Sequence, residues 1–382
     1  MVSRYSQFSR LASLLLVAFA FVLIPYAQGQ LPNHLTKRVV ADYGSWSKTQ
    51  VPPYSAAQIP YRELTHINHA GINFDANGNL QVPDGFIEPE LLNQSHALGV
   101  KVLLLLGGDF GGMEANGAPA ARALVENILA FEKQYGYDGV DLDWEYPSTS
   151  TDKELLTAIM AGLRSAEPSY VLSVDVPPWN AGGYDTKRLQ SVINYVNIMM
   201  YDCAGQWTAH GQLNSPIFWD PRDPAPYECQ PGGSASEAAS IYLQQLPPSQ
   251  INMGTPFYGY VYTNINQLFG LCPNSAWTPD GDCDNTVLTG NYGPNFKPVI
   301  NKQGWHTIYD PIALVPYMLR DDGGPGYITY DDYFSTYNRV WYSDWVRGLG
   351  GTFMWSLDAD YDGHSQDLMD AMYAASAINV RP

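Results

Sequence analysis

The 382-residue sequence has few basic residues, few cysteines and only one long hydrophobic run. Its 20 Lys and Arg residues stand against 38 Asp and Glu residues, for a formal net charge of −18. A chain this acidic is repelled by nucleic-acid phosphates and by anionic lipid surfaces, so we expect neither as a partner. An uncharged substrate is compatible with this charge, although much of the acidic excess serves only as a soluble exterior.

The single long hydrophobic run lies between Leu11 and Pro25. Arg4 and Arg10 precede it and the small-residue segment Ala27-Gln28-Gly29 follows it, which is the pattern of a secretory signal peptide. A membrane anchor is the alternative, but it needs about 20 apolar residues, and this run is shorter. We therefore predict a signal peptide at residues 1–29 and a secreted, extracellular protein. Removal of this signal peptide takes away Arg4 and Arg10 and changes the formal net charge from −18 to −20.

Only four cysteines are present, and an even number is typical of an oxidising compartment. Cys272 and Cys283 lie eleven residues apart in a polar stretch, which favours a disulfide-bonded loop. That pairing leaves Cys203 for Cys229, but four cysteines allow three pairings, so this is only a preference. None of them has the spacing of zinc ligands. One sequon predicts N-glycosylation at Asn93, provided that its helix face is exposed.

Eight short apolar segments recur along the chain, separated by segments of helix length. Continuous apolar runs are typical of strands buried on both faces of a parallel sheet. Alternation of strand and helix through eight repeats predicts an α/β protein with a closed (β/α)8 barrel, or TIM barrel. The predicted strands are Val39–Tyr43, His66–Asn73, Val102–Leu106, Gly139–Asp143, Tyr170–Val174, Val196–Met200, Ile251–Pro256 and Gly351–Trp355. Helical patterns include Glu88–Leu98, Pro119–Tyr135, Asp152–Glu167 and Ser234–Leu246.

No linker rich in proline, glycine or serine divides the sequence, so we predict a single catalytic domain over residues 30–382. Between the seventh and eighth strands, about residues 260–326 exceed what a barrel loop needs and predict a small disulfide-stapled insertion. An open doubly wound sheet is the alternative fold, but no Gly-x-Gly-x-x-Gly segment follows the first strand. The dibasic pair Lys37-Arg38 is either a processing site or a chance pair in a loop.

The segment Asp138–Pro147 carries acidic residues at alternate positions of a predicted strand. Because side chains alternate across a strand, Asp141, Asp143 and Glu145 point to one side, which in a barrel is the interior. Glu145 would lie nearest the mouth, whereas Asp138 has the opposite parity and is expected to be structural. Like charges and desolvation both favour neutral acids, so the row retains at least one proton, as a general acid requires.

This row, Asp-Gly-Val-Asp-Leu-Asp-Trp-Glu, resembles the Asp-x-x-Asp-x-Asp-x-Glu signature of family 18 glycoside hydrolases, the chitinases and their relatives. The resemblance continues in the same order along nearly the whole mature chain. The matching segments are Tyr43-Gly-Ser-Trp46, His66-Ile-Asn-His-Ala70, Leu105-Leu-Gly-Gly108, Met199-Met-Tyr-Asp202, Gly254-Thr-Pro-Phe-Tyr-Gly259 and Gly348–Asp358.

The resemblance implies a role for each matching residue. Glu145 would protonate the glycosidic oxygen, and the substrate's own 2-acetamido carbonyl would attack the anomeric carbon. Asp143 would bind the acetamido N–H and balance the developing positive charge, while Asp141 would tune the protonation of Asp143. Tyr201 would orient the acetamido oxygen, and Trp355 would stack beneath the reacting sugar. The other predicted binding residues are Tyr43, Trp46, Met199, Asp202 and Tyr258.

Three positions depart from the family pattern. Leu105 replaces a serine, Gly71 stands where a phenylalanine often lines the site, and Tyr260 stands where an arginine often follows the seventh strand. The catalytic row itself is intact. These departures reshape the cleft. The length and orientation of the substrate are therefore not transferred from the family to this sequence.

The activity expected from the resemblance is that of a secreted, endo-acting chitinase that hydrolyses chitin or chitooligosaccharides with retention. An endo-β-N-acetylglucosaminidase acting on N-glycan cores is one alternative, and a non-catalytic chitin-binding lectin is another. The lectin is disfavoured because both Asp143 and Glu145 are present. A metal-dependent hydrolase is a further alternative, since alternate acids also suit calcium or magnesium. No ligand loop rich in Asn, Asp and Gly surrounds the row, so we expect no metal and no cofactor. Nothing indicates an obligate partner, and we expect a monomer.

Overall fold

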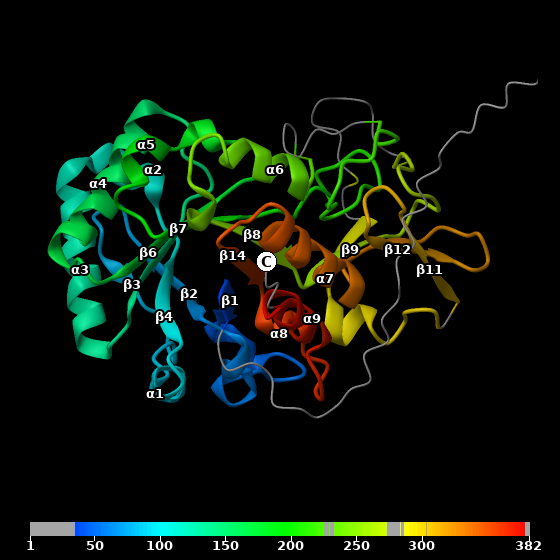
Figure 1. Cartoon of the computed structure of the whole chain (residues 1–382), viewed down its shortest axis with the longest axis horizontal. Helices are drawn as coiled ribbons and strands as arrows, with labels where there is room; N and C mark the ends of the chain where they lie inside the picture. Colours follow the sequence, from blue (N-terminus) through cyan, green and yellow to red (C-terminus); the bar gives the residue numbers. More distant parts are fainter. Residues whose placement is uncertain are drawn as a thin grey trace, which may run out of the picture. The chain divides into compact units, whose positions relative to one another are not determined.

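The structure is a computed structural model, and it describes residues 35–224, 229, 233–272, 283, 286–302 and 304–378. The predicted signal peptide, residues 1–29, lies outside the described residues. Within these residues the chain forms a ring of parallel strands with helices around it. The colours of Figure 1 follow the sequence and allow the order of these elements to be traced. No helix in these ranges is long and apolar enough to cross a membrane.

Eight parallel strands pair in the order β1-β14-β8-β7-β6-β5-β4-β2, and β1 also pairs with β2, which closes the ring. Closure leaves no barrel strand with an unpaired edge. The predicted (β/α)8 barrel is therefore confirmed. The ring strands are β1 Arg38–Gly44, β2 His66–Phe74, β4 Lys101–Leu106, β5 Gly139–Asp143, β6 Val171–Val176, β7 Tyr195–Ile198, β8 Ile251–Pro256 and β14 Gly351–Trp355. A short strand, β3 Leu80–Gln81, pairs antiparallel with β2.

Helices cover the outer face of the ring, and their apolar faces meet the outward side chains of the strands in the main core. Helix α3 buries Leu124 and Ile128 in this core, where they join Val140 and Leu142 of β5. This burial, rather than helix propensity, supplies most of the stability of such helices. The helices are α1 Pro89–Ala97, α2 Phe110–Asn116, α3 Ala118–Tyr135, α4 Ser150–Ala166, α5 Thr186–Leu189, α6 Ala235–Tyr242, α7 Tyr333–Trp341, α8 Leu357–Asp360 and α9 Asp367–Ser376.

A second sheet lies between β8 and α7 in the sequence. Its five strands are antiparallel in the order β10-β9-β13-β12-β11, and β9, β11 and β12 are labelled in Figure 1. The insertion predicted at about 260–326 begins inside the first of these strands and ends before the last, so the inserted structure is larger than expected. The strands are β9 Tyr258–Tyr262, β10 Val287–Asn291, β11 Trp305–Tyr309, β12 Pro316–Arg320 and β13 Tyr327–Thr329.

Both preferred disulfides are present. Cys203 bonds Cys229 across the long connection after β7, and Cys272 bonds Cys283 inside the insertion. The first bond closes a loop of 26 residues, and in the chain-entropy model such a cross-link stabilises a protein by about 3.5 kcal/mol. The two bonds therefore restrict the connection and the insertion that flank strands β7 and β8.

The dibasic pair lies at the start of the first barrel strand, with Lys37 in the bend just before it. Lys37 Nζ donates a hydrogen bond to the carbonyl oxygen of Leu349, and Arg38 begins β1. Arg38 Nε donates to Asn252 Oδ1 at 3.0 Å, and its guanidinium also donates to the carbonyl oxygen of Ser249. These contacts tie the first strand to β8 and to the segment before β14.

The predicted glycosylation site lies on α1. Asn93 is exposed there, which meets the condition on which its glycosylation depends, whereas Ser95 of the same sequon is buried. Glycosylation of Asn93 stays a prediction.

Candidate active site

A pocket of about 690 Å³ opens where the strands of the ring end, the position at which barrel enzymes carry their chemistry. Seven of the ten predicted catalytic and binding residues line it, and no lysine or arginine is among its described lining residues. The lining residues are Asp143, Glu145, Tyr146, Asp175, Trp179, Met199, Tyr201, Asp202, Tyr258 and Trp355.

Glu145 follows the end of β5 and is the most exposed member of the acidic row. Withdrawal from water inside the pocket raises its pKa above that of an ordinary glutamate. A hydrogen bond from Tyr146 opposes this shift, and the nearby Asp202 adds to it. The raised pKa favours the protonated form, so the carboxyl at the mouth can act as a proton donor.

Asp143 ends β5 and lies one level deeper than Glu145. Burial raises its pKa to about 8, with further contributions from the charges of Glu145 and Asp141. Its Oδ1 atom is buried and has no hydrogen-bond partner among the described residues. Because a buried acceptor normally has a donor, this oxygen is suited to receive an N–H group from a bound ligand.

Asp141 is fully buried beneath Asp143. Asn68 Nδ2 donates to its Oδ2 at 2.5 Å, and Asn197 Nδ2 donates to the same oxygen at 3.2 Å. Burial raises the pKa of Asp141 to about 6, and hydrogen bonds, including those from Asp175, Asn197 and Asn68, limit the rise. Proton affinity therefore differs along the row, and the deepest member ionises more readily than Asp143.

Tyr201 and Asp202 follow β7 and form another part of the pocket wall. Tyr201 is buried, and desolvation raises its pKa well above the usual range, so the phenol stays a neutral donor. Asp202 accepts hydrogen bonds from Tyr258 and Tyr260, each at 2.5 Å. Tyr260, at the position where the family often has arginine, thus holds Asp202 with an uncharged donor.

The backbone at Asp202 adopts a φ of 62°, which non-glycine residues seldom do. Asn214 stabilises this turn because its Oδ1 accepts from the Asp202 N–H at 2.9 Å, and its backbone oxygen accepts from Cys203. Asn214 was not among the predicted site residues. Its contribution depends on a long-range contact that the motif after β7 does not contain.

Two tryptophans form an aromatic surface at one side of the pocket. Trp355 ends β14 and lines the pocket, and its ring centroid lies 6.1 Å from that of Trp46. Trp46 is 43% exposed and extends the surface beyond the pocket. A Cβ added at Gly71 would lie 3.6 Å from the Trp46 ring, so the glycine leaves this side open.

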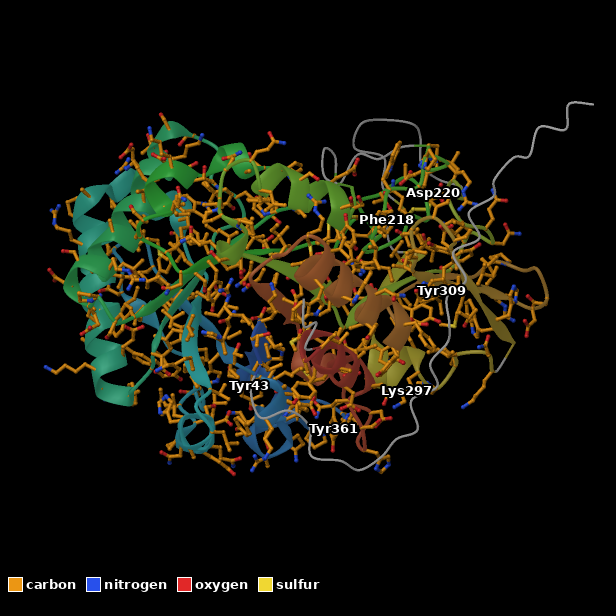
Figure 2. All side chains as sticks on the ribbon, in the orientation of Figure 1. Tyr43, Phe218, Asp220, Lys297, Tyr309 and Tyr361 are labelled. Carbon is orange, nitrogen blue, oxygen red and sulfur yellow. A yellow bond between two sulfur atoms is a disulfide. The ribbon has the colours of Figure 1, made fainter. Side chains whose placement is uncertain are left out.

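Tyr43 does not line the pocket, and this prediction is wrong. Its hydroxyl donates to Glu88 Oε1 at 3.0 Å and its ring stacks on His69, so it belongs to the layer between strands and helices. Figure 2 labels its position on the ribbon. Strand parity explains the error, because the neighbouring Asp42 takes the inward position and accepts from Asn68 at 2.8 Å.

Sequence reasoning also missed Asp175, Trp179 and Tyr146 in the pocket wall. Asp175 is the register partner of Asp143 on the adjacent strand β6. A lone acid in the apolar run Val171–Val176 is the same kind of signal that identified the row on β5, and it could have been used. Trp179 packs edge-on against Tyr146 with ring centroids 5.6 Å apart.

Asp138, expected to be structural, lies at the opposite end of β5 from the pocket. It pairs with Lys101 and with His96, each at 2.8 Å. Within the described ranges, no three or more His, Cys, Asp or Glu side chains are grouped in a way that could hold a metal ion.

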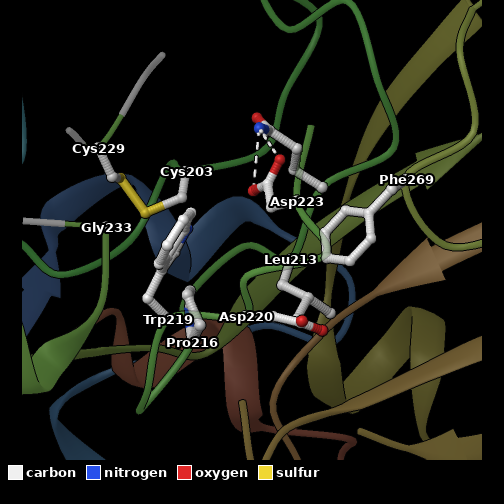
Figure 3. Close-up of a pocket in the computed structure, with 10 residues that line it drawn as sticks. Cys203, Leu213, Pro216, Trp219, Asp220, Asp223, Cys229, Gly233 and Phe269 are labelled. Atoms are coloured by element: carbon white, nitrogen blue, oxygen red, sulfur yellow. Dashed lines mark hydrogen bonds between the residues drawn. A yellow bond between two sulfur atoms is a disulfide. The ribbon is translucent and has the colours of Figure 1, made fainter. Parts of the chain in front are cut away.

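A second pocket, of about 330 Å³, lies against the Cys203–Cys229 disulfide (Figure 3). One wall contains the Gln212–Asp223 hydrogen bonds drawn there, at 3.1 and 3.2 Å. Its other acid, Asp220, is paired with Arg222. The lining of this second pocket contains no residue of the acidic row, so the pocket above β5 is the candidate active site.

Comparison with known proteins agrees with this geometry. The sequence model described as glycosyl hydrolases family 18 matches residues 38–360. The chain therefore belongs to family 18 of the glycosyl hydrolases. The resemblance deduced from the acidic row is confirmed, and so is the enzyme class, glycoside hydrolase.

Curated relatives include a probable endochitinase of Caenorhabditis elegans, 28% identical over 68% of this chain and 44% of that protein. Endochitinase 1 of Metarhizium robertsii is 24% identical over 81% of this chain and 78% of the relative. The chain thus spans less than half of the first relative and most of the second. A further relative, the endochitinase of Manduca sexta, is 25% identical over 85% of this chain and 64% of its own length.

Similar solved structures share the fold. The Group IV chitinase of Ostrinia furnacalis in complex with allosamidin has a TM-score of 0.75 at 22% identity, covering 88% of this chain and 98% of that one. An immunomodulatory chitinase from Trichuris suis has a TM-score of 0.76 at 21% identity, covering 89% and 99%.

Proposed function

We propose that this protein is a chitinase that hydrolyses β-1,4-linked N-acetylglucosamine chains at internal positions. The observation that carries the proposal is the acidic row at the mouth of the barrel, with Glu145 outermost and the unpartnered Oδ1 of Asp143 beneath it. The described lining residues include no lysine or arginine, which suits an uncharged sugar chain. Relatives named as endochitinases support the same substrate class.

In the proposed mechanism Glu145 gives its proton to the glycosidic oxygen as that oxygen's bond to the anomeric carbon breaks. The carbonyl oxygen of the substrate's 2-acetamido group supplies the electron pair that forms the new bond to the anomeric carbon, giving an oxazolinium ion. The ionised Glu145 then takes a proton from water as the water oxygen attacks the same carbon, and the bond between that carbon and the acetamido oxygen breaks to restore the acetamido group. Two displacements at one carbon give net retention.

Asp143 and Tyr201 act on the acetamido group from opposite sides. The Oδ1 atom of Asp143 accepts the acetamido N–H. The positive charge that develops on the ring favours the ionised form of the Asp143 carboxyl, which then offsets that charge. Tyr201 donates to the acetamido oxygen and holds it close to the anomeric carbon, which supplies near-attack geometry. The neutral phenol favoured by the raised pKa of Tyr201 supports this assignment. Asp141, beneath the pair, tunes the protonation of Asp143.

Binding follows from the aromatic and polar surfaces around the row. Trp355 stacks under the reacting sugar, because a flat aromatic ring matches the apolar face of a pyranose. Trp46 extends this surface for the next sugar along the chain, and Met199 completes the apolar wall. Asp202, held by Tyr258, offers a hydrogen-bond acceptor to sugar hydroxyls.

The protein is further proposed to be secreted after removal of residues 1–29. Two disulfides in the folded domain support an oxidising compartment, because such bonds are rare in the reducing cytosol. Expression of the full chain in a secreting host, with N-terminal sequencing of the product in the medium, tests this point. A product that starts near residue 30 is the expected result, and a chain retained in the cell with residues 1–29 attached contradicts it.

The substrate is tested by incubating the mature protein with chitotetraose and, separately, with a high-mannose N-glycopeptide. Glu145→Gln serves as the blank in both reactions. We expect chitobiose from the tetramer and no release by the variant. Release of the N-glycan with intact chitotetraose would instead identify an endo-β-N-acetylglucosaminidase, for which the open side at Gly71 leaves room. Binding of chitin by the wild type without any cleavage would identify a lectin.

A further inference from the structure

A line of polar side chains follows the strand register around the inside of the barrel. The register pairs Asp143 of β5 with Asp175 of β6, and Asp175 with Asn197 of β7. It then pairs Asn197 with Asn252 of β8. The line ends at Arg38, whose Nε atom lies 3.0 Å from Asn252 Oδ1. A continuous polar path therefore joins the catalytic pocket to the opposite end of the barrel.

Gly351 makes the last contact possible. It occupies the register position between Asn252 and Arg38 on strand β14. A Cβ at this position would lie 2.3 Å from the backbone oxygen of Arg38 and 2.6 Å from its Cβ. The absence of a side chain at Gly351 lets the arginine cross β14 and reach the asparagine.

All donors along this line point toward the acids. Arg38 has no acceptor, so Asn252 must turn its oxygen toward the guanidinium and its Nδ2 toward Asn197. Asn252 Nδ2 then donates to Asn197 Oδ1 at 2.9 Å. Asn197 Nδ2 in turn donates to Asp175 Oδ1 at 3.0 Å and to Asp141 Oδ2 at 3.2 Å. Both asparagines are fully buried, so water does not compete for these bonds.

Asp175 and Asp141 are direct neighbours, because they accept from the same nitrogen and are hydrogen-bonded to each other. Two buried carboxylates in contact cannot both be ionised. Asp141 receives the additional donor Asn68, whereas burial and three surrounding acids raise the pKa of Asp175 well above its usual range. The proton therefore resides on Asp175 and the charge on Asp141. The titratable groups that face Asp175 are Asp141 and Asp143 of β5, Asp42 of β1, and Tyr184, Tyr195 and Tyr201.

We propose that Asp175 is a positioning residue for the glycosidase reaction: as a neutral carboxyl oriented by the Arg38–Asn252–Asn197 line, it donates to Asp141 and keeps the interior charge there. The charge then lies directly beneath Asp143, where it stabilises the cation that develops above the row. The inference rests on the proposed function, since it assigns a role within that reaction.

Two substitutions at one position test this role with chitotetraose as substrate. Asp175→Asn keeps a donor toward Asp141 and an acceptor for Asn197, so it imitates the neutral acid. We expect kcat within about threefold of the wild type. We also expect no change in the acidic limb of the pH profile of kcat/KM. Asp175→Leu removes the donor and raises the pKa of Asp141. Its kcat is expected to fall about tenfold or more with little change in KM, and its acidic limb to move up by about half to one pH unit.

Two further variants separate this role from a general effect of buried polar groups. Asp360 is also fully buried with a pKa raised to about 8, but it accepts from the backbone of Leu368 and Met369 and does not line the pocket. Asp360→Asn should leave the acidic limb in place. Arg38→Met leaves the side-chain amides of Asn252 and Asn197 free to rotate. It should move the acidic limb of the pH profile in the same direction as Asp175→Leu, but by less.

Each outcome decides one question. If Asp175→Leu keeps the wild-type profile, or if Asp175→Asn moves the acidic limb as far as Asp175→Leu, the inference is wrong. Thermal unfolding of both variants identifies loss of fold, and Asp175→Asn still tests the proposal if Asp175→Leu does not fold. Failure of the wild type to cleave chitotetraose would contradict the proposed function and not the hydrogen-bond line.

Discussion

The two ends of strand β5 carry the same residue type in opposite electrostatic environments. At its start, burial raises the pKa of Asp138, but hydrogen bonds from Lys101, Val102 and His96 outweigh burial and bring it below the usual range. At its end, burial and the charges of Glu145 and Asp141 raise the pKa of Asp143 to about 8. Neighbouring donors and charges, and not the residue type, therefore separate a structural anion from a group that holds a proton.

The largest expected effect lies at the mouth of the barrel. Glu145→Gln should lower kcat on chitotetraose by several orders of magnitude, because the proposed mechanism takes the proton for the leaving oxygen from Glu145 and an amide has no acidic proton to give. The measurement is turnover alongside binding, since the amide keeps the shape of the side chain and binding should persist. Near-normal turnover would remove Glu145 from the role of acid.

Asp143→Asn should cost about 10²–10³ in kcat, the usual effect of losing one electrostatic stabiliser. The corresponding Asp138→Asn variant, at the other end of the strand, should keep kcat within about twofold. Comparable losses in the two variants would mean that the two ends of β5 do not differ in the way described.

The same two variants should change stability in opposite directions. At pH 7 the folded protein keeps Asp143 protonated, whereas the unfolded chain, with a pKa near 3.9, does not. The contribution of Asp143 to stability therefore falls as pH rises from about 4 to about 8, and Asp143→Asn should raise Tm at pH 7 by a few degrees. A lower Tm for this variant would contradict the raised pKa.

Asp138→Asn should lower stability by about 1–2 kcal/mol, because the amide cannot replace both charged hydrogen bonds. The folded pKa of Asp138 is depressed, so this stabilisation is present above the unfolded pKa of about 3.9 and is lost as pH falls through the folded pKa. Urea unfolding at pH 7 and at pH 3 measures the difference. An equal loss at both pH values would point to packing instead of charge.

The smallest effect is expected outside the row. Trp46→Ala removes the more exposed ring of the Trp46–Trp355 pair. The variant should have a KM for chitotetraose several-fold higher than the wild type, with little change in kcat. Tyr309→Ala, at an exposed position in the inserted sheet, is the matched control. A fall in kcat without a change in KM would place Trp46 in the chemistry and not in binding.

The acidic row could be predicted from the sequence because strand alternation is local. Asp141, Asp143 and Glu145 occupy positions i, i+2 and i+4, so one strand assignment places all three. The same rule was available for β1, but motif matching there favoured Tyr43, and the inward residue is Asp42. Parity within a strand is a stricter guide than similarity of a short aromatic segment.

The remaining parts of the site depend on contacts between residues far apart in the chain. Arg38 and Asn252 are separated by 214 positions, and nothing local to either residue indicates their hydrogen bond. The inserted sheet was underestimated because its strands are three to five residues long and β11 is only partly buried, which gives little periodicity. Asp175 is an isolated acid whose significance comes from its register with Asp143.

Strand β9 starts two residues after β8 ends, and its residues Tyr258 and Tyr260 are the ones that hold Asp202. The first strand of the inserted sheet is therefore also a wall of the pocket. A shift of that strand along its neighbour β13 would carry both phenols away from the carboxylate. Engineering of the insertion has to begin beyond Tyr262, since any cut closer to the barrel alters the shape of the substrate cleft as well as the added sheet.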